Sequence, residues 1–410
     1  MGNDLELVAP TIPLITKKSN KILGDLNYEF IDLTNTQKRL FGRKALKPQI
    51  DINDYTTRAV IDWIDIRVLL NRNTQFRWLQ RDIKNILGKK VQITNSLTQP
   101  NDPDDLFDIR FQEPEIETLR KIFSEIKTRY GLDMDPVVAG MEISIDFYPK
   151  TASDLERAKM VRVLSNHMLV ETDMISDHRD RPRAVWGTKK GSYQKILAGN
   201  TDFSEGANRE LLIATDWDHP PYADATVVIG AKEADVRWRI MDKVIDTQNR
   251  DAGTYEELTE KDRRARIEVT LNQTEMQKLG VQHFDALKEF NFSSLQGKYF
   301  RFFLPTFSGR AVHKTVWREA ITVARDRYRM IKFRSSGGVG LQAMDQARAE
   351  TQNIIRKQTL TAMHNSGLKL PLRKRVATGS SQTFVAYREL NERVLIALRN
   401  LGKRVHKGFL

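Results

Sequence analysis

Val138-Ala-Gly-Met-Glu-Ile-Ser-Ile-Asp-Phe-Tyr148 is the stretch from which the fold can be inferred. Its apolar and polar residues alternate, as they do in a β-strand whose successive side chains point to opposite faces of a sheet. One face is apolar and carries Met141, Ile143, Ile145 and Phe147. The other face is polar and carries Glu142, Ser144, Asp146 and Tyr148. Such a face is usually solvated, but two carboxylates flanking a serine also suit a metal ion and a phosphate.

The segments before this strand predict a β-α-β-β-α-β unit. Residues 61–70, 90–94 and 106–111 have strand patterns, and helical patterns cover residues 74–88 and 114–131. Gly88 and Gly131 follow the apolar stripes of the two helices, which is typical of helix ends. This order is that of ferredoxin-like folds, in which the first and fourth strands are neighbours in one antiparallel sheet. We therefore expect an α+β fold with such a core.

Adjacent first and fourth strands would bring carboxylates together. Ile64, Ile66 and Val68 are expected to face the helices, which leaves Asp65 on the polar face beside Trp63 and Arg67. Asp65 would then lie near Glu142 and Asp146, and like charges this close repel one another. A hard divalent cation, Mg²⁺ or Mn²⁺, would relieve the repulsion. The sequence thus predicts a metal site of Asp65, Glu142 and Asp146, with Glu268 as a possible further ligand.

Composition limits the class of protein. The chain has 410 residues, 40% of them hydrophobic, which is enough for a sizeable core. It has no cysteine, which excludes disulfides, thiolate catalysis and iron–sulfur clusters, and is compatible with a reducing compartment. No apolar run is long enough to span a membrane, and the N-terminus does not resemble a signal peptide. We expect a cytoplasmic protein without a membrane partner.

Positive charge is concentrated at the C-terminal end. Residues 301–410 hold 22 Lys and Arg against 6 Asp and Glu, so they carry a net charge of +16, and the first 300 residues carry −3 of the total of +13. This asymmetry indicates a polyanionic partner, nucleic acid first and an anionic membrane second. We divide the chain into an N-terminal arm (1–55), a catalytic domain (56–300) and a basic helical DNA-binding region (301–410). The basic side chains expected to contact DNA are Arg67, Arg237, Arg239, Lys243, Arg266, Arg373, Lys374, Arg375, Arg399, Lys403 and Arg404.

A second run of strands completes a family resemblance. Strand patterns at 225–230, 236–243 and 264–271 contain Thr226-Val-Val-Ile-Gly230, Arg239-Ile-Met-Asp-Lys243 and Arg266-Ile-Glu-Val. Together with Ile61-Asp-Trp63 and the strand of Glu142, these segments resemble, in order and spacing, the trans-acting rolling-circle replication initiators of plasmids and the related relaxases of conjugative elements. The resemblance covers about residues 60–272.

The resemblance implies a function. Members of this family nick one DNA strand at an origin by attack of a tyrosine, which leaves a 5′-phosphotyrosine and a 3′-hydroxyl for a polymerase. Origin duplex and single-stranded DNA are then the expected partners. The sequence contains no Gly-x-x-x-x-Gly-Lys-Ser/Thr motif, so unwinding would need a separate helicase. The oligomeric state is left open, a homodimer included.

The nucleophile is the point at which the sequence departs from the family. Val228 and Met241 stand where the family patterns have tyrosines. Three other tyrosines are candidates: Tyr222, before the strand of Val228; Tyr193, near Lys189 and Lys190; and Tyr148, on the face of the carboxylates. If none of them attacks DNA, the alternative is a non-catalytic DNA-binding protein derived from such an initiator.

Overall fold

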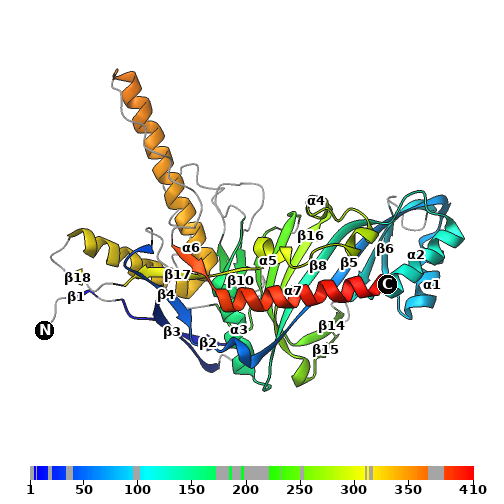
Figure 1. The fold of residues 1–410 in the computed structure, drawn as a ribbon, viewed down its shortest axis with the longest axis horizontal. Helices are drawn as coiled ribbons and strands as arrows, with labels where there is room; N and C mark the ends of the chain where they lie inside the picture. The colour runs from blue at the N-terminus through cyan, green and yellow to red at the C-terminus, as the bar shows by residue number, and fades with distance from the viewer. Residues whose placement is uncertain are drawn as a thin grey trace.

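The structure is a computed structural model of the chain. It describes residues 4–5, 7–16, 21–33, 40–95, 102–171, 184–186, 195–197, 221–231, 233–249, 254–309, 312–313, 317–367 and 383–410. Tyr193 and the Arg373-Lys374-Arg375 run lie outside these ranges. The described chain is an α+β protein with antiparallel sheets and several helices, in agreement with the expected class (Figure 1).

Within the described ranges, the large sheet has nine strands, each antiparallel to its neighbours. Across the sheet these are β11 (Lys195–Leu197), β10 (Ala184–Trp186), β12 (Val227–Ile229), β13 (Val236–Lys243), β16 (Arg264–Asn272), β8 (Val137–Pro149), β5 (Tyr55–Thr74), β7 (Asp104–Gln112) and β6 (Gln92–Asn95).

The β-α-β-β-α-β run supplies one half of this sheet. β5 is followed by α1 (Phe76–Leu87), β6, β7, α2 (Ile116–Tyr130) and β8. β5 lies between β8 and β7, so the predicted pairing of the first and fourth strands is confirmed. Gly88 and Gly131 follow the two helices with positive φ, a conformation that glycine adopts without strain.

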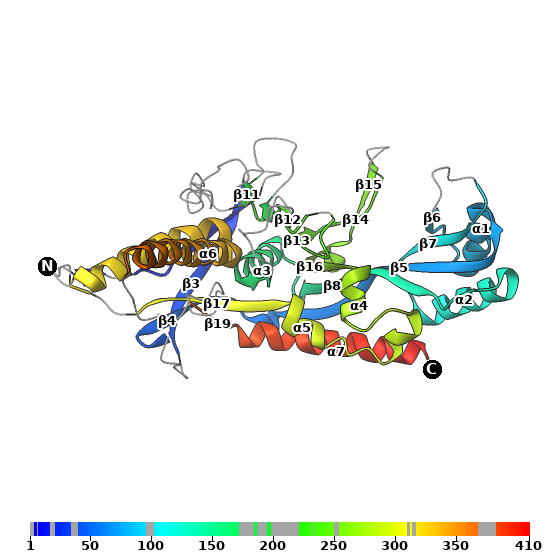
Figure 2. The ribbon, with the colours of Figure 1, turned by 90° about the horizontal axis from the view of Figure 1, so that it is seen from above.

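The large sheet has an apolar and a polar face. Met141, Ile143, Ile145 and Phe147 of β8 are fully buried. Helices cover this face: Phe123 of α2 packs edge-on against Phe111 of β7, and α3 (Asp154–His167) contacts β13 and β16 (Figure 2). Ser153 caps α3 by accepting a hydrogen bond from the Glu156 N–H. The polar residues of β8, β5 and β16 lie on the opposite face.

The N-terminal residues belong to a second sheet rather than to an arm. β2 (Thr11–Ile15), β3 (Ile22–Asp32) and β4 (Arg43–Pro48) join β17 (Arg301–Ser308) and β19 (Phe384–Ala386) in the order β19-β17-β4-β3-β2. Ile12, Leu14, Leu26 and Tyr28 are buried at alternate positions. Because two of its strands come from the last quarter of the chain, this sheet joins the predicted arm to the predicted C-terminal region. Residues 301–410 are therefore not purely helical.

Shorter elements connect these parts. They are β1 (Asp4–Leu5) with β18 (Val312–His313), β9 (Met168–Leu169), β14 (Ile245–Asn249) with β15 (Thr254–Glu257), α4 (Gln273–Lys278) and α5 (Ser294–Tyr299). Two long helices follow: α6 (Trp317–Asn365) and α7 (Arg388–Gly408).

The glycine-rich segment 335–340 is a buried kink in α6. Gly337 has φ 64° and ψ −158°, which no helical residue adopts, and the helix continues on both sides of it. Residues 335–340 are buried, because Gly337 and Gly338 pack against the backbone at the end of α3. The second half of α6 projects from the body of the protein (Figure 1).

Replacing Gly337 by alanine should therefore destabilise the protein by about 2 to 5 kcal/mol. The new Cβ would lie 2.7 Å from the Asn166 Cα and 2.9 Å from the Ser165 carbonyl oxygen, at a positive φ. Urea unfolding followed by circular dichroism measures the change. Gly402→Ala is the matched control, since its Cβ would meet nothing closer than 3.6 Å and α7 should gain slightly from alanine. Equal stabilities of the two variants would contradict the close packing at the kink.

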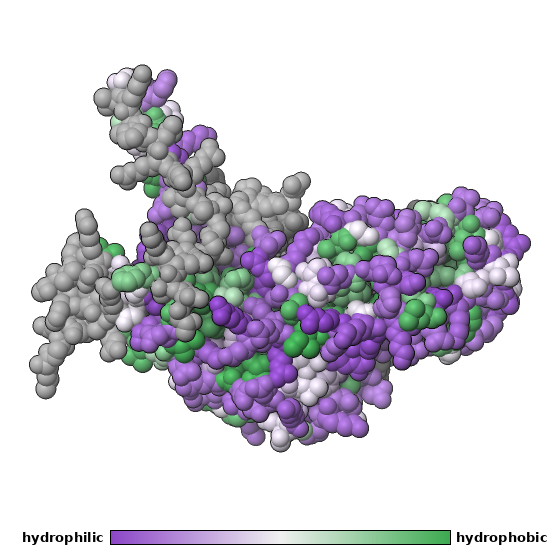
Figure 3. Space-filling model, in the orientation of Figure 1, coloured by the Kyte–Doolittle hydropathy of each residue, from purple (hydrophilic) through white to green (hydrophobic). Residues whose placement is uncertain are grey.

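α7 lies along β5 with its apolar side inward (Figures 1 and 2). The buried residues of α7 are Leu390, Val394, Ala397, Leu398, Leu401 and Val405. Arg399, Lys403 and Arg404 are exposed, as the sequence predicts. The face of the molecule that carries α7 is largely hydrophilic (Figure 3). Among the described residues, we find no helix with the length and apolar character needed to cross a membrane.

Candidate metal centre

Three carboxylates from three neighbouring strands meet on the polar face of the large sheet. One oxygen each of Asp62 on β5, Glu142 on β8 and Glu268 on β16 lie within 4.8 Å of one another. Glu142 is 5% exposed and Glu268 is 1% exposed. β8 lies between β5 and β16, and register brings Glu142 opposite Trp63 on one side and Thr270 on the other. We call Asp62, Glu142 and Glu268 the acidic triad.

Asp62 occupies the place that the sequence predicts for Asp65. The pairing of β5 with β8 shifts by one residue between Ile61 and Trp63, which is a β-bulge. The bulge lets Ile61 and Ile64 both remain buried while Asp62 lies outside the core with Trp63. The spacing of three between these isoleucines interrupts the alternation, and this is the sequence signal from which Asp62 could have been found.

Asp65 lies farther along β5 and forms an ion pair with Arg110 of β7. The Arg110 Nε and Nη2 atoms donate to its two oxygens at 2.7 and 2.6 Å. The same two-bond geometry joins Arg67 to Asp108, at 2.8 and 2.9 Å. The Arg110 guanidinium also lies 4.0 Å from the centre of the Trp63 ring. Asp65 and Arg67 are thus engaged with protein partners on a partly exposed surface.

Asp146, also predicted as a ligand, is held by two arginines of β16. Arg266 donates Nε and Nη2 to its oxygens at 2.5 and 2.8 Å, and the Arg264 Nε lies 3.1 Å from Oδ1. The Arg266 Nη1 reaches the acidic triad, 2.7 Å from Asp62 Oδ1 and 3.5 Å from Glu268 Oε1. Although burial opposes a charged guanidinium, the hydrogen bonds to Asp146 raise the pKa of Arg266. A buried, charged Arg266 therefore links Asp146 to the acidic triad.

Arg239 of β13 lies across the two glutamates of the triad. Its guanidinium donates to Glu268, and its Nη2 lies 3.6 Å from Glu142 Oε1. The Thr270 hydroxyl donates to Glu142 Oε2 at 2.6 Å. Burial, and then the charge of Glu268, raise the pKa of Glu142 to about 7; burial also raises the pKa of Glu268. At neutral pH Glu142 is therefore near its midpoint of protonation, and a divalent cation would replace its proton.

Ser144 supplies an independent sign of a ligand. Its Oγ is completely buried and has no hydrogen-bond partner in the described part of the chain. Ser144 lies between Glu142 and Asp146 on the same strand face and is paired with Glu268. An unsatisfied buried hydroxyl costs about 1 to 3 kcal/mol, which a bound ion or its water would relieve. Carboxylate and hydroxyl oxygens are donors that Mg²⁺ and Mn²⁺ accept, so the residues present fit such an ion.

Tyr148 is the candidate nucleophile that lies on the polar face. Its hydroxyl is 3.4 Å from Asp146 Oδ2, and the Arg264 Cζ lies 5.5 Å from the centre of its ring. Burial, and then the charge of Asp146, raise the pKa of Tyr148. Of the two candidates that the structure describes, Tyr148 and Tyr222, Tyr148 is the one in contact with residues around the triad.

The described contacts around Tyr222 lie away from the triad. Tyr222 follows Pro221, whose carbonyl accepts a hydrogen bond from Arg162 of α3, and precedes Ala223, whose N–H donates to Ile15 of β2. These contacts hold the segment on the side of the sheet covered by α3, opposite the triad. Tyr193 lies outside the described residues.

Val228 and Met241, the positions at which the resemblance to the initiators implies tyrosines, lie on the polar face. Val228 is paired with Arg239, and Met241 is paired with Arg266. Directly paired residues of antiparallel strands point to the same side of the sheet. A tyrosine at either position would therefore share a face with the arginines of the site.

The predicted DNA contacts divide into two groups. Arg67, Arg239 and Arg266 are occupied by carboxylates, as described above. Arg237 and Lys243 are half-buried on β13, and Arg399, Lys403 and Arg404 are exposed on α7. Of these, the exposed α7 side chains are the most accessible to a phosphate backbone.

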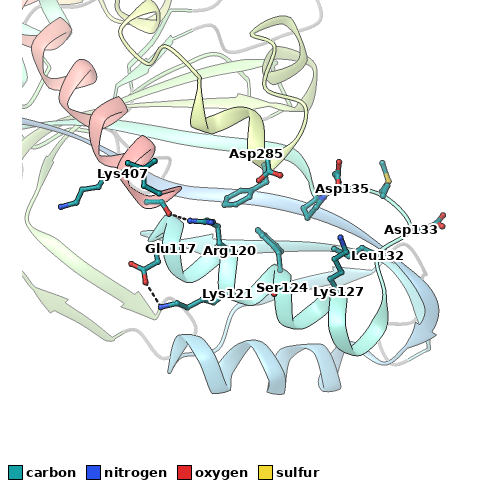
Figure 4. A pocket seen from close by; sticks show the side chains of 16 residues that line it. Glu117, Arg120, Lys121, Ser124, Lys127, Leu132, Asp133, Asp135, Asp285 and Lys407 are labelled. Atoms are coloured by element: carbon teal, nitrogen blue, oxygen red, sulfur yellow. Dashed lines mark hydrogen bonds and ion pairs between the residues drawn. The ribbon is translucent and has the colours of Figure 1, made fainter.

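Away from the acidic triad, a hollow of about 1010 Å³ lies between α2, the loop before β8 and the C-terminus (Figure 4). It carries charges of both signs, with Arg120, Lys121 and Lys127 on α2 and Asp133, Asp135 and Asp285 on its other walls. A mixed lining of this kind favours no single class of ligand, in contrast to the acidic triad.

No protein-family model matches the chain, and a search of curated proteins finds none with a similar sequence. Function must therefore be inferred from the site itself.

Proposed function

We propose that this protein is a metal-dependent enzyme that nicks and rejoins one DNA strand, as rolling-circle replication initiators do. The observation that carries the proposal is the buried acidic triad beside two arginines on one face of an antiparallel sheet. The strands that resemble the initiator motifs are consecutive in that sheet, in the order β12-β13-β16-β8-β5. The order β8-β5-β7-β6 further supports a ferredoxin-like core.

The acidic triad is the site that we propose for Mg²⁺ or Mn²⁺. When bound, such an ion polarises a phosphodiester and offsets the negative charge of the transition state. Arg239 and Arg266 add positive charge around the same position, and their bonds to Glu268 and Asp146 hold them in place before the substrate arrives. Charges fixed in advance need little reorganisation during the reaction, which is how proteins stabilise a transition state most effectively.

Tyr148 is the attacking group that we propose. Its oxygen would form a bond to the phosphorus while the bond to the 3′ oxygen breaks, leaving a 5′-phosphotyrosine and a 3′-hydroxyl, and the reverse step would rejoin the strand. Because the pKa of Tyr148 is raised, a base must remove its proton, and Asp146 is 3.4 Å from the hydroxyl. Arg264, beside the ring, favours the phenolate.

Exposed cations of α7 are proposed to contact the phosphate backbone of origin duplex and single strand. Arg399 and Lys403 are exposed on the side of α7 away from its buried residues. A separate helicase would unwind the duplex, and a polymerase would extend the 3′-hydroxyl.

A non-catalytic DNA-binding protein is the second candidate function. It is favoured by the two guanidiniums that already offset part of the charge of the triad, and by Val228 and Met241 at the positions where the family has tyrosines. In such a protein the triad and its arginines would serve as a buried ion-pair network that stabilises the sheet.

Incubation with negatively supercoiled plasmid carrying the origin of the protein's own element tests the proposal. With Mn²⁺, the enzyme should convert the plasmid to the open circular form and become covalently attached to DNA in a detergent-resistant adduct. EDTA should prevent both, and Tyr148→Phe should prevent the adduct. DNA binding without nicking or adduct would favour the non-catalytic candidate, and an adduct mapped to another tyrosine would reassign the nucleophile.

The affinity for Mn²⁺ should rise with pH. Below about pH 7, binding must displace the Glu142 proton, so the affinity should increase up to about tenfold per pH unit from pH 5.5 to 7 and level off above that. Calorimetric titration in several buffers measures both the affinity and the protons released. Asp65→Asn, which changes a carboxylate outside the triad, should leave the pH profile unchanged. An affinity independent of pH would rule out Glu142 as a ligand.

A further inference from the structure

A hollow of about 650 Å³ lies at the free edge of β5, next to the acidic triad. β7 pairs with β5 from Trp63 onward, so the first part of β5 has β8 as its strand neighbour in the described chain. The end of α7, with Leu401 and Val405, closes one side of the hollow. Residues 113–117, at the start of α2, close another.

Positive side chains from three elements line this hollow. They are Arg58 of β5, Arg264 and Arg266 of β16, and Arg404 and Lys407 of α7. Tyr148 forms part of the same wall. Four carboxylates also line it: Glu113, Glu115, Glu117 and Asp146.

Two of these carboxylates are already offset. Arg266 and Arg264 hold Asp146, and Lys121 lies 2.7 Å from Glu117 (Figure 4). Glu113 and Glu115 are exposed, as are Arg58, Arg404 and Lys407. With five cations and four carboxylates, the lining has a net charge of +1.

Arg58, Arg404 and Lys407 have no carboxylate in ion-pair contact within the described ranges of the chain. Arg404 donates to the backbone carbonyl of Ala59, at the unpaired edge of β5. Burial, and then the charge of Arg58, lower the pKa of Arg404, so the two guanidiniums are near enough to repel each other. An anion between them would turn this repulsion into attraction.

We propose that this hollow, the phosphate pocket, binds a phosphate group of the DNA strand next to the one that reacts at the acidic triad. Arg58 and Arg404 are the phosphate ligands, since a guanidinium matches the geometry of phosphate oxygens. Arg266 connects the two sites: its Nη1 contacts Asp62 of the triad, while its Nε and Nη2 hold Asp146 on the pocket wall. That the ligand is DNA rests on the proposed function.

Anisotropy of a fluorescent single-stranded oligonucleotide, measured in EDTA so that no cleavage occurs, tests the phosphate pocket. The double variant Arg58→Gln, Arg404→Gln should bind about tenfold more weakly at low salt, with a salt slope smaller by about one unit. Lys84→Gln, Lys90→Gln removes the same charge from an exposed surface near α1 and should change affinity by no more than about twofold. Equal losses in the two double variants would overturn the pocket, because only the overall charge would then matter.

The double variant Arg58→Lys, Arg404→Lys separates charge from fold. It should recover part of the affinity, whereas a protein that merely lost packing would not, and thermal unfolding of every variant is measured alongside. Inorganic pyrophosphate is titrated separately. If the glutamine variants lose pyrophosphate binding but bind the oligonucleotide normally, the ligand is a free phosphate compound and the DNA assignment is overturned.

Failure of the proposed function gives a different result. A protein that binds the oligonucleotide through the phosphate pocket, yet never nicks DNA with Mn²⁺, would contradict the enzyme and keep the pocket. Nicking that survives unchanged in the Arg58→Gln, Arg404→Gln variant, with normal oligonucleotide affinity, would contradict the pocket and keep the enzyme.

Discussion

Glu142→Gln should abolish Mn²⁺ binding and DNA nicking and yet make the metal-free protein more stable at pH 8. Glutamine keeps the shape of the side chain and can still accept the hydrogen bond from Thr270, but it offers a neutral oxygen to a metal ion. The gain in stability follows from the raised pKa of Glu142, about 7 against an ordinary 4.5. Ionising Glu142 costs more free energy in the folded protein, where the side chain is buried, than in the unfolded chain, where water solvates it.

A carboxyl group whose pKa is higher in the folded state favours folding below pH 4.5, and this contribution is lost as pH rises through about 7. Glu142→Gln should remove this loss, so the variant gains up to about 3 kcal/mol over the wild type at pH 8 and little at pH 4. Urea unfolding in EDTA at both pH values measures the difference.

Asp65→Asn is the control for this experiment, because Asp65 is a partly exposed carboxylate outside the triad. It should retain metal binding and show no comparable gain at pH 8. A Glu142→Gln protein that nicks DNA at the wild-type rate would remove Glu142 from the metal site. A variant less stable than the wild type at pH 8 would mean that the Glu142 charge is stabilised by Arg239 more than it is disfavoured by burial.

The strands with strong alternation could be predicted from sequence. Residues 236–243 match β13, residues 264–271 match β16 to within one residue, and the pairing of the first and fourth strands followed from the order of elements. Local periodicity determines such strands because each has one buried face. Periodicity within one strand gives no sign of a register shift between two strands. Because of the bulge after Ile61, Asp62 lies in the site where the alternation predicted Asp65.

Contacts between distant segments could not be predicted. β2, β3 and β4 pair with one another in sequence order, but the sheet is completed by β17, which lies more than 250 residues after β4 and pairs with it. The ion pairs that engage Asp146 and Asp65 depend on which arginine lies opposite on the neighbouring strand. Of the four ligands predicted from carboxylates alone, Glu142 and Glu268 lie in the triad, and its third member is Asp62.

Arg266→Ala should be the most destabilising substitution in the site, by about 3 kcal/mol or more at pH 8. Arg266 is buried and donates hydrogen bonds to Asp146 and Asp62. Without it, the Asp146 charge would remain buried with Arg264 as its nearby cation. Uncompensated burial of a carboxylate is costly even where the intact pair adds little net stability.

The destabilisation by Arg266→Ala should exceed that caused by breaking a similar pair at the surface. Arg110→Ala is the matched control: it also removes an arginine with two bonds to an aspartate, but Asp65 and Arg110 are partly exposed. It should cost about 1 kcal/mol or less. Urea unfolding of both variants at pH 8 gives the comparison. Similar losses of stability for Arg266→Ala and Arg110→Ala at pH 8 would mean that water reaches Asp146. In a site open to water, the two arginines would be screened and would stabilise the charge of a reacting phosphate only weakly.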